Sequence, residues 1–171
     1  MGVFDLVLQI LKTLFEVRVF VKGKVDMQKS LYFMKELGYL VPFNYRWSKL
    51  GPYSYELANV LERLTSQGYL RYTGRYELDE KHFRFVEPNV TPELERFFLT
   101  LEKFCNKNNL KDIDFIECAA SLHFIYKNYP NKEKEVIFRR LASLKPDRMD
   151  AFQPLMEHAW EFLKEQGLRG S

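Results

Sequence analysis

Cysteine and histidine are scarce in this chain, and their scarcity excludes several kinds of site. Of 171 residues, only Cys105 and Cys118 are cysteine, and three are histidine. A structural zinc site needs about four cysteine or histidine ligands at close spacing, and no CxxC pair is present. Because an unpaired cysteine behaves as a small hydrophobic residue, we expect two buried free thiols in a reducing compartment. The sequence thus predicts a cytoplasmic protein without metal or cofactor.

Long uninterrupted apolar runs are also missing. The segment from Val3 to Val21 is rich in Val, Leu, Ile and Phe, but Asp5, Gln9 and Lys12 begin a series of polar residues about one helical turn apart. A membrane span needs about 20 consecutive apolar residues, and a signal peptide places its charges before its apolar core. The segment is typical of an amphipathic helix, and we expect no membrane association.

The excess of positive charge is small. Lys and Arg number 26 against 23 Asp and Glu, which gives a net charge of +3. That excess permits a basic patch but does not require a nucleic-acid partner. Residues 1–88 carry all of it, since they hold 13 basic and 10 acidic residues, whereas residues 89–171 hold 13 of each. Any basic surface therefore belongs to the first half.

The stretch Gly51-Pro-Tyr-Ser54 is the strongest local signal in the chain. Gly51 is free to take positive φ, and Pro52 fixes its own φ and has no N–H to donate. Proline is favoured at the first position of a helix, so the pair predicts a break followed by a helix that starts at Pro52. Apolar residues then recur at helical spacing until Gly68, which is placed to end the helix.

The segments around this helix complete the pattern of a winged helix. Helices are predicted over 3–21 and from an N-cap at Asp26 to Gly38, and short strands over 43–48 and 69–72. The stretch 69–86 is the predicted wing, with Phe83 and Phe85 alternating as in a strand. Two turns could join its strands, one at 73–74 and one at 79–81.

The rest of the chain is predicted to be helical. Helices are expected from Thr91 to about Asn106, from Asp112 or Asp114 to Tyr129, and then over 131–144 and from 147 to about 166. The expected fold class is mainly α with a small antiparallel sheet (α+β). We expect a winged-helix-like domain over 1–88 and a four-helix extension over 89–171, and short connections favour packing of one on the other.

Three stretches carry a resemblance to a known family. They are Met27-Gln-Lys-Ser-Leu-Tyr-Phe-Met-Lys-Glu-Leu-Gly38, Phe43-Asn-Tyr-Arg-Trp47 and the Gly51-Pro-Tyr-Ser54 stretch. Together they resemble the YwgA-like proteins, an uncharacterised bacterial and archaeal family distantly related to the Panacea domain of antitoxins and phage-associated proteins. The later stretch from Glu117 to Leu122 and the pair Lys145-Pro146 extend the resemblance over most of the chain. Met27 departs from the leucine usual in the family. The resemblance implies a winged-helix-like fold followed by helices, and it brings no catalytic residue.

Basic and aromatic residues alternate around the predicted wing and favour double-stranded DNA as a partner. A winged helix places its third helix in the major groove and its wing against the phosphate backbone. Against this, the predicted third helix holds Glu56 and Glu62 but only one cation, and acidic side chains face phosphates at a cost. The candidate DNA-binding residues are Arg46, Lys49, Asn59, Arg63, Arg71, Arg75, Lys81 and Arg84.

A protein-interaction or antitoxin-like module that binds a partner protein, or a second copy, is the alternative. Aromatic side chains anchor interfaces, and several of them crowd the Gly51–Ser54 junction. An enzyme is not expected, since His82, His123 and His158 lie outside any catalytic motif. A histidine on an apolar face such as His123 is usually a core residue with its polar atoms satisfied. Burial would raise the pKa of the Glu117 carboxyl, but this side chain could equally face solvent or pair with Lys145.

Overall fold

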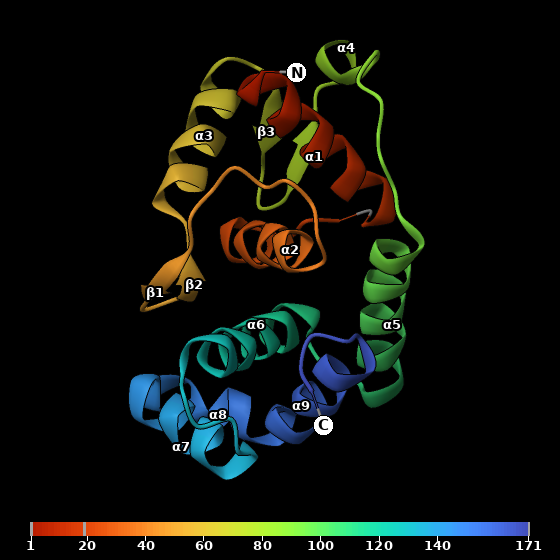
Figure 1. Cartoon of the computed structure of the whole chain (residues 1–171). Coiled ribbons are helices and arrows are strands. Elements are labelled where there is room, and N and C mark those ends of the chain that lie inside the picture. The colour runs from red at the N-terminus through yellow and green to blue at the C-terminus, as the bar shows by residue number, and fades with distance from the viewer. Residues whose placement is uncertain (1, 19, 171) are drawn as a thin grey trace.

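A computed structural model describes residues 2–18 and 20–170 of the chain. The chain is mostly helical with two small antiparallel two-stranded sheets, so the predicted α+β class is confirmed. Figure 1 shows α1, α2, α3 and the two hairpins in one layer, α6 to α9 in a second, and α5 along one side of both. In the described residues, none of the helices combines the length and the apolar character that a membrane crossing requires.

Two helices open the chain, the amphipathic α1 (Val3–Val17) and α2 (Lys24–Glu36), which is buried all round from Asp26 to Met34. The sequence predicts a first helix as far as Val21, but α1 ends at Val17 because Arg18 is extended; residue 19 lies outside the described residues. The predicted N-cap at Asp26 is wrong, since the N-cap of α2 is Gly23. Asp26 lies in the first turn, where its carboxylate accepts hydrogen bonds from the Lys22 backbone N–H and the Arg18 guanidinium at 2.9 and 3.1 Å.

The Gly51–Ser54 stretch forms a hairpin and not the start of a helix. Strands β1 (Arg46–Ser48) and β2 (Gly51–Tyr53) are antiparallel, so the prediction of Pro52 as the first helical residue is wrong. Helix α3 (Tyr55–Ser66) begins after Ser54, whose hydroxyl accepts a hydrogen bond from the Leu57 N–H at 3.1 Å. The stretch is extended because of a side chain on another helix. The buried Lys29 ammonium of α2 donates hydrogen bonds to the carbonyl oxygens of Leu50 and Pro52 and holds this backbone extended.

A second hairpin follows α3. It consists of β3 (Leu70–Tyr72) and β4 (Tyr76–Leu78), joined through Gly74, so the first of the two candidate turns is the one used. The predicted strand through Phe83 and Phe85 is wrong, because α4 (Glu80–Phe83) occupies this position. The Asp79 carboxylate caps α4 by accepting from the His82 N–H, so the second candidate turn starts a helix.

The remaining helices follow the predicted order with two corrections. Thr91 caps α5 as predicted. The helix predicted over 131–144 begins only at Lys134, after the N-cap Glu133, and the Asn131 side-chain oxygen accepts from the Glu133 N–H. The single last helix predicted to about residue 166 is interrupted around Pro154. The elements are α5 (Pro92–Asn108), α6 (Asp112–Asn128), α7 (Lys134–Leu144), η1 (Pro146–Arg148), α8 (Met149–Phe152), η2 (Gln153–Leu155) and α9 (Met156–Glu165).

One hydrophobic core runs through both layers, and α6 lies at its centre. Helix α6 packs against α2, α7, α9 and β2. The rings of Phe33 on α2 and Phe97 on α5 lie 4.8 Å apart, and Phe115 on α6 contacts Phe162 on α9 at 5.5 Å. Both cysteines are free and buried in this core, as the sequence predicts. The core fixes α2 and, through the hairpin β1–β2, the start of α3.

Candidate nucleic-acid interface

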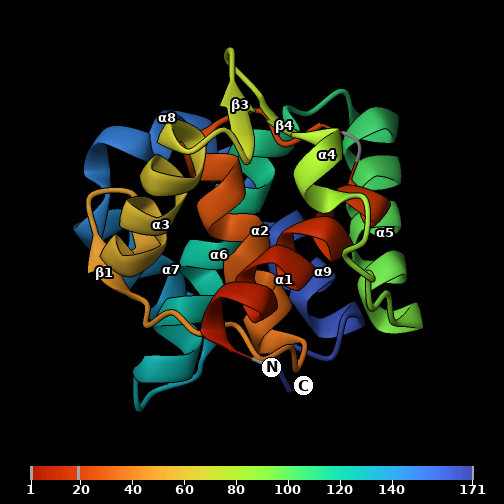
Figure 2. The same ribbon diagram turned by 90° about the horizontal axis from the view of Figure 1, so that it is seen from above.

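Helix α3 presents one buried face and one exposed face. Leu57, Leu61 and Leu64 pack into the core, whereas Asn59 and Arg63, one turn apart, are exposed. Hairpin β1–β2 precedes its first turn and hairpin β3–β4 follows its last, and Figure 2 shows the second hairpin projecting beyond the neighbouring helices. The arrangement offers a polar helix face with a hairpin at either end.

The predicted DNA-binding residues are all exposed, but they do not form one group. Their side chains come from three places: Arg46 and Lys49 from the first hairpin, Asn59 and Arg63 from α3, and the rest from the second hairpin and α4. Figures 1 and 2 place α4 across hairpin β3–β4 from α3. Lys81 and Arg84 on α4 are therefore not brought together with the α3 face.

Several of the cations already have partners within the chain. The Arg71 guanidinium lies 3.2 Å from the Asp79 carboxylate and 3.9 Å from that of Glu77. The Arg75 guanidinium lies over the Phe20 ring, 4.6 Å from its centroid. Arg46 lies over Tyr55 at 5.7 Å. These contacts orient the three side chains, and the carboxylates beside Arg71 also offset its positive charge.

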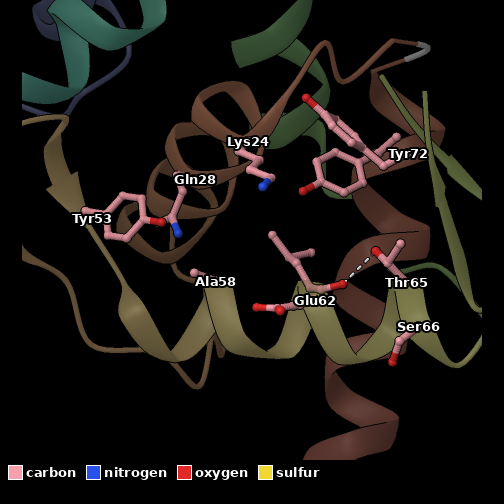
Figure 3. Close-up of a pocket in the computed structure, with 10 residues that line it drawn as sticks. Lys24, Gln28, Tyr53, Ala58, Glu62, Thr65, Ser66 and Tyr72 are labelled. Carbon is pink, nitrogen blue, oxygen red and sulfur yellow. Dashed lines mark hydrogen bonds between the residues drawn. The ribbon is translucent and has the colours of Figure 1, made fainter. Parts of the chain in front are cut away.

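A hollow of about 540 Å³ lies between α2, α3 and hairpin β3–β4. Figure 3 shows Lys24 reaching from α2 toward α3, with Tyr53 and Tyr72 at the two ends. Lys24 is not among the binding residues predicted from the sequence. Its position could have indicated it, because Lys24 follows Gly23 at the start of the helix that precedes the Gly-Pro stretch. The lining residues are Lys24, Gln28, Tyr53, Ala58, Leu61, Glu62, Thr65, Ser66, Tyr72 and Tyr76.

The walls of this hollow are held by specific contacts. The Gln28 amide N–H donates to the Ser54 carbonyl at 2.8 Å, and the Ser54 N–H donates to the Gln28 side-chain oxygen at 2.9 Å. Gln28 thereby fixes the start of α3 against α2. The rings of Tyr72 and Tyr76 lie 4.7 Å apart. Burial, with the neighbouring phenols of Tyr72 and Tyr53, raises the pKa of Tyr76 to about 12, so it is a neutral hydroxyl at pH 7.

A second cluster of polar residues is buried in the core where α2, the first hairpin and α6 meet. Burial lowers the pKa of Lys29 to about 7. The Lys145 ammonium lies 2.8 Å from the Glu117 carboxylate, so of the alternatives for Glu117 the pairing with Lys145 is the one formed. The Tyr32 hydroxyl and Nδ1 of His123 lie 2.6 Å apart, which confirms His123 as a core histidine with a polar partner. These groups are almost fully buried, so they lie apart from the exposed surface around α3.

Neither a metal site nor a match to a known family indicates what this surface binds. In residues 2–18 and 20–170, no group of three His, Cys, Asp or Glu side chains is placed to hold a metal ion. No protein-family model matches the sequence, and searches of curated proteins and of solved structures returned no match. The geometry of the surface is therefore the guide to its function.

Proposed function

We propose that this protein is a non-enzymatic, winged-helix-like DNA-binding regulator. In this proposal α3 lies in the major groove and hairpin β3–β4 rests on the phosphate backbone. The observation that carries the proposal is the exposed polar face of α3 between two hairpins that bear cations, the second of which projects beyond the neighbouring helices. Asn59 and Arg63 supply side chains of the kinds that hydrogen-bond to adenine and guanine edges.

The acidic residues of α3 oppose DNA less than the sequence suggests. The Glu56 carboxylate accepts a hydrogen bond from the Asn44 backbone N–H at 2.9 Å and is engaged with the segment before the hairpin. Glu62 remains exposed beside Arg63. Lys24, which lines the hollow beside α3, adds an exposed cation beyond those predicted from the sequence.

A titration with labelled duplex from the gene's own upstream region tests the proposal. Saturable binding should weaken steeply between about 50 and 200 mM salt, because phosphate contacts release counterions. Arg63→Ala should cost about 1–3 kcal/mol of binding free energy at specific sites, whereas Arg75→Glu should weaken binding to every sequence. Arg96→Ala, an exposed arginine on α5, is the matched control and should bind as the parent does. Absence of binding at low salt would exclude the proposal.

A protein-interaction or antitoxin-like module is the second candidate, and one observation favours it. The cations of the two hairpins are largely engaged within the chain, while Tyr55 and Phe20 beside them are 55% and 48% exposed. Exposed aromatic side chains anchor interfaces. Sedimentation analysis of the purified chain tests self-association: Tyr55→Ala should lower the association constant, and the pair Arg71→Glu and Arg75→Glu should leave it unchanged. A monomer at all concentrations would remove the second-copy form of this candidate.

A further inference from the structure

The hollow between α2, α3 and hairpin β3–β4 has the dimensions of a small-molecule site. Ligand pockets in proteins generally measure about 300–1,000 Å³, and this one measures about 540 Å³. Its walls come from α2, α3, hairpin β3–β4 and Tyr53 of β2, and the Gln28–Ser54 hydrogen bonds hold α2 against the start of α3. It is therefore a concave space that exists before any ligand arrives.

The lining combines apolar surface with an ammonium and three phenols that are not hydrogen-bonded to other lining residues. Leu61 and Ala58 supply apolar surface, and three tyrosines supply aromatic walls. Among the residues drawn in Figure 3, the one hydrogen bond joins the Thr65 hydroxyl to the Leu61 carbonyl. The ammonium of Lys24 and the tyrosine hydroxyls are thus left to donate to a guest.

The formal charges of the lining cancel, but its ammonium and three phenols favour a guest that accepts hydrogen bonds. Lys24 and the phenols of Tyr53, Tyr72 and Tyr76 are donors, whereas Glu62 is the one carboxylate of the lining. Lys24 Nζ lies 5.9 Å from the centroid of the Tyr72 ring. A carboxylate held by this ammonium places its own ring beside Tyr72 and Tyr76, where aromatic contacts are favourable. A dianion such as a phosphate monoester would meet stronger repulsion from Glu62 than a monocarboxylate does.

We propose that this hollow binds a small aromatic monocarboxylate, with the carboxylate on Lys24 and the ring between the tyrosines. The hollow lies along α3 beside its exposed face, since Glu62 lines the hollow and is the chain neighbour of Arg63. Where the proposed DNA-binding function holds, the bound carboxylate neutralises Lys24 and weakens duplex binding. The binding step itself does not depend on that function.

Benzoate is the probe, and amide chemical shifts of the isotope-labelled full chain are the readout. Benzoate should shift resonances of the lining residues saturably, with a dissociation constant on the order of 1 mM, as expected for so small a ligand. Lys24→Met should weaken binding at least tenfold, and Tyr72→Ala should weaken it as well. Both side chains are exposed, so both variants should fold. Lys164→Met, an exposed lysine on α9, should bind benzoate as the parent does.

Two further ligands determine the chemistry, and one competition separates the two proposals. Benzylamine and adenosine monophosphate should bind at least tenfold more weakly than benzoate. Equal or tighter binding of either, shifts outside the hollow, or no effect of Lys24→Met would overturn the assignment. Benzoate is then added to the duplex titration. Duplex binding without benzoate binding refutes this inference alone, and benzoate binding without duplex binding refutes the DNA proposal alone.

Discussion

Replacing Gly51 by alanine should destabilise the protein by two separable effects. Gly51 has φ +80, a region that L residues rarely adopt. A Cβ at this position would also lie 2.6 Å from the Ser121 hydroxyl oxygen of α6, closer than atoms can approach without a shift. The backbone strain arises in the turn of the first hairpin, and the steric clash arises where this hairpin packs on α6.

Their magnitudes can be estimated separately. A left-handed conformation costs an L residue about 1–2 kcal/mol, and overpacking a core adds about 1–3 kcal/mol. Gly51→Ala should therefore cost about 2–5 kcal/mol of unfolding free energy. Gly68 provides the matched control: it has φ +83, and no atom lies within 4 Å of the position that a Cβ would take, so Gly68→Ala should cost the conformational part alone.

Urea denaturation of a double-mutant cycle measures the packing part directly. The Ser121 hydroxyl is buried without a hydrogen-bond partner, so Ser121→Ala alone should change stability little. In the Ser121→Ala background, the cost of Gly51→Ala should fall to that of Gly68→Ala. An equal cost of Gly51→Ala in both backgrounds would refute the close approach of the hairpin to α6.

Three further predictions concern buried and capping groups. Burial holds the pKa of Lys29 near 7, below its ordinary 10.5, so the unfolded chain binds more protons between these values and stability should rise with pH. Lys29→Met should flatten this rise in urea titrations between pH 7 and 8.5, and an unchanged slope would contradict it. Glu117→Gln should lower the unfolding free energy by about 3–5 kcal/mol, because it leaves the buried Lys145 ammonium without its carboxylate. A loss below about 1 kcal/mol would show that this ion pair does not stabilise the fold. Thr91→Ala should cost about 0.5–2 kcal/mol by removing the acceptor of the Leu94 N–H, and unchanged thermal unfolding would contradict this.

The sequence predicts those parts of the fold that local chemistry determines. Thr91 followed by proline starts α5 as expected, and the amphipathic pattern of α1 appears as a helix with one buried face. The prediction for the Gly51-Pro52 pair is wrong because a break before a helix and a tight hairpin use the same residues. The choice between them depends on Lys29, which lies on another helix and donates to the carbonyls of Leu50 and Pro52.

The sequence predicts which single residues of the candidate site are exposed, but not how they are arranged on the surface. Exposure of the predicted cations follows from their charge. Their partners do not, since the contact of Arg75 with Phe20 joins segments far apart in the sequence. The hollow is not predictable for the same reason, because it needs Lys24, Tyr53 and Tyr72 from three separate elements.

The Gly51–Ser54 stretch connects the two regions in which this protein carries unusual chemistry. Gly51 lies against Ser121 of α6, and the Pro52 carbonyl accepts from Lys29, so the first two residues belong to the buried polar cluster. Tyr53 forms a wall of the hollow, and the buried Ser54 caps α3, so the last two position the hollow and the helix beside it. Because adjacent residues of one strand cannot move independently, strain introduced at Gly51 should reach the start of α3. The Gly51→Ala variant should therefore weaken benzoate binding even where it remains folded, whereas Gly68→Ala should not.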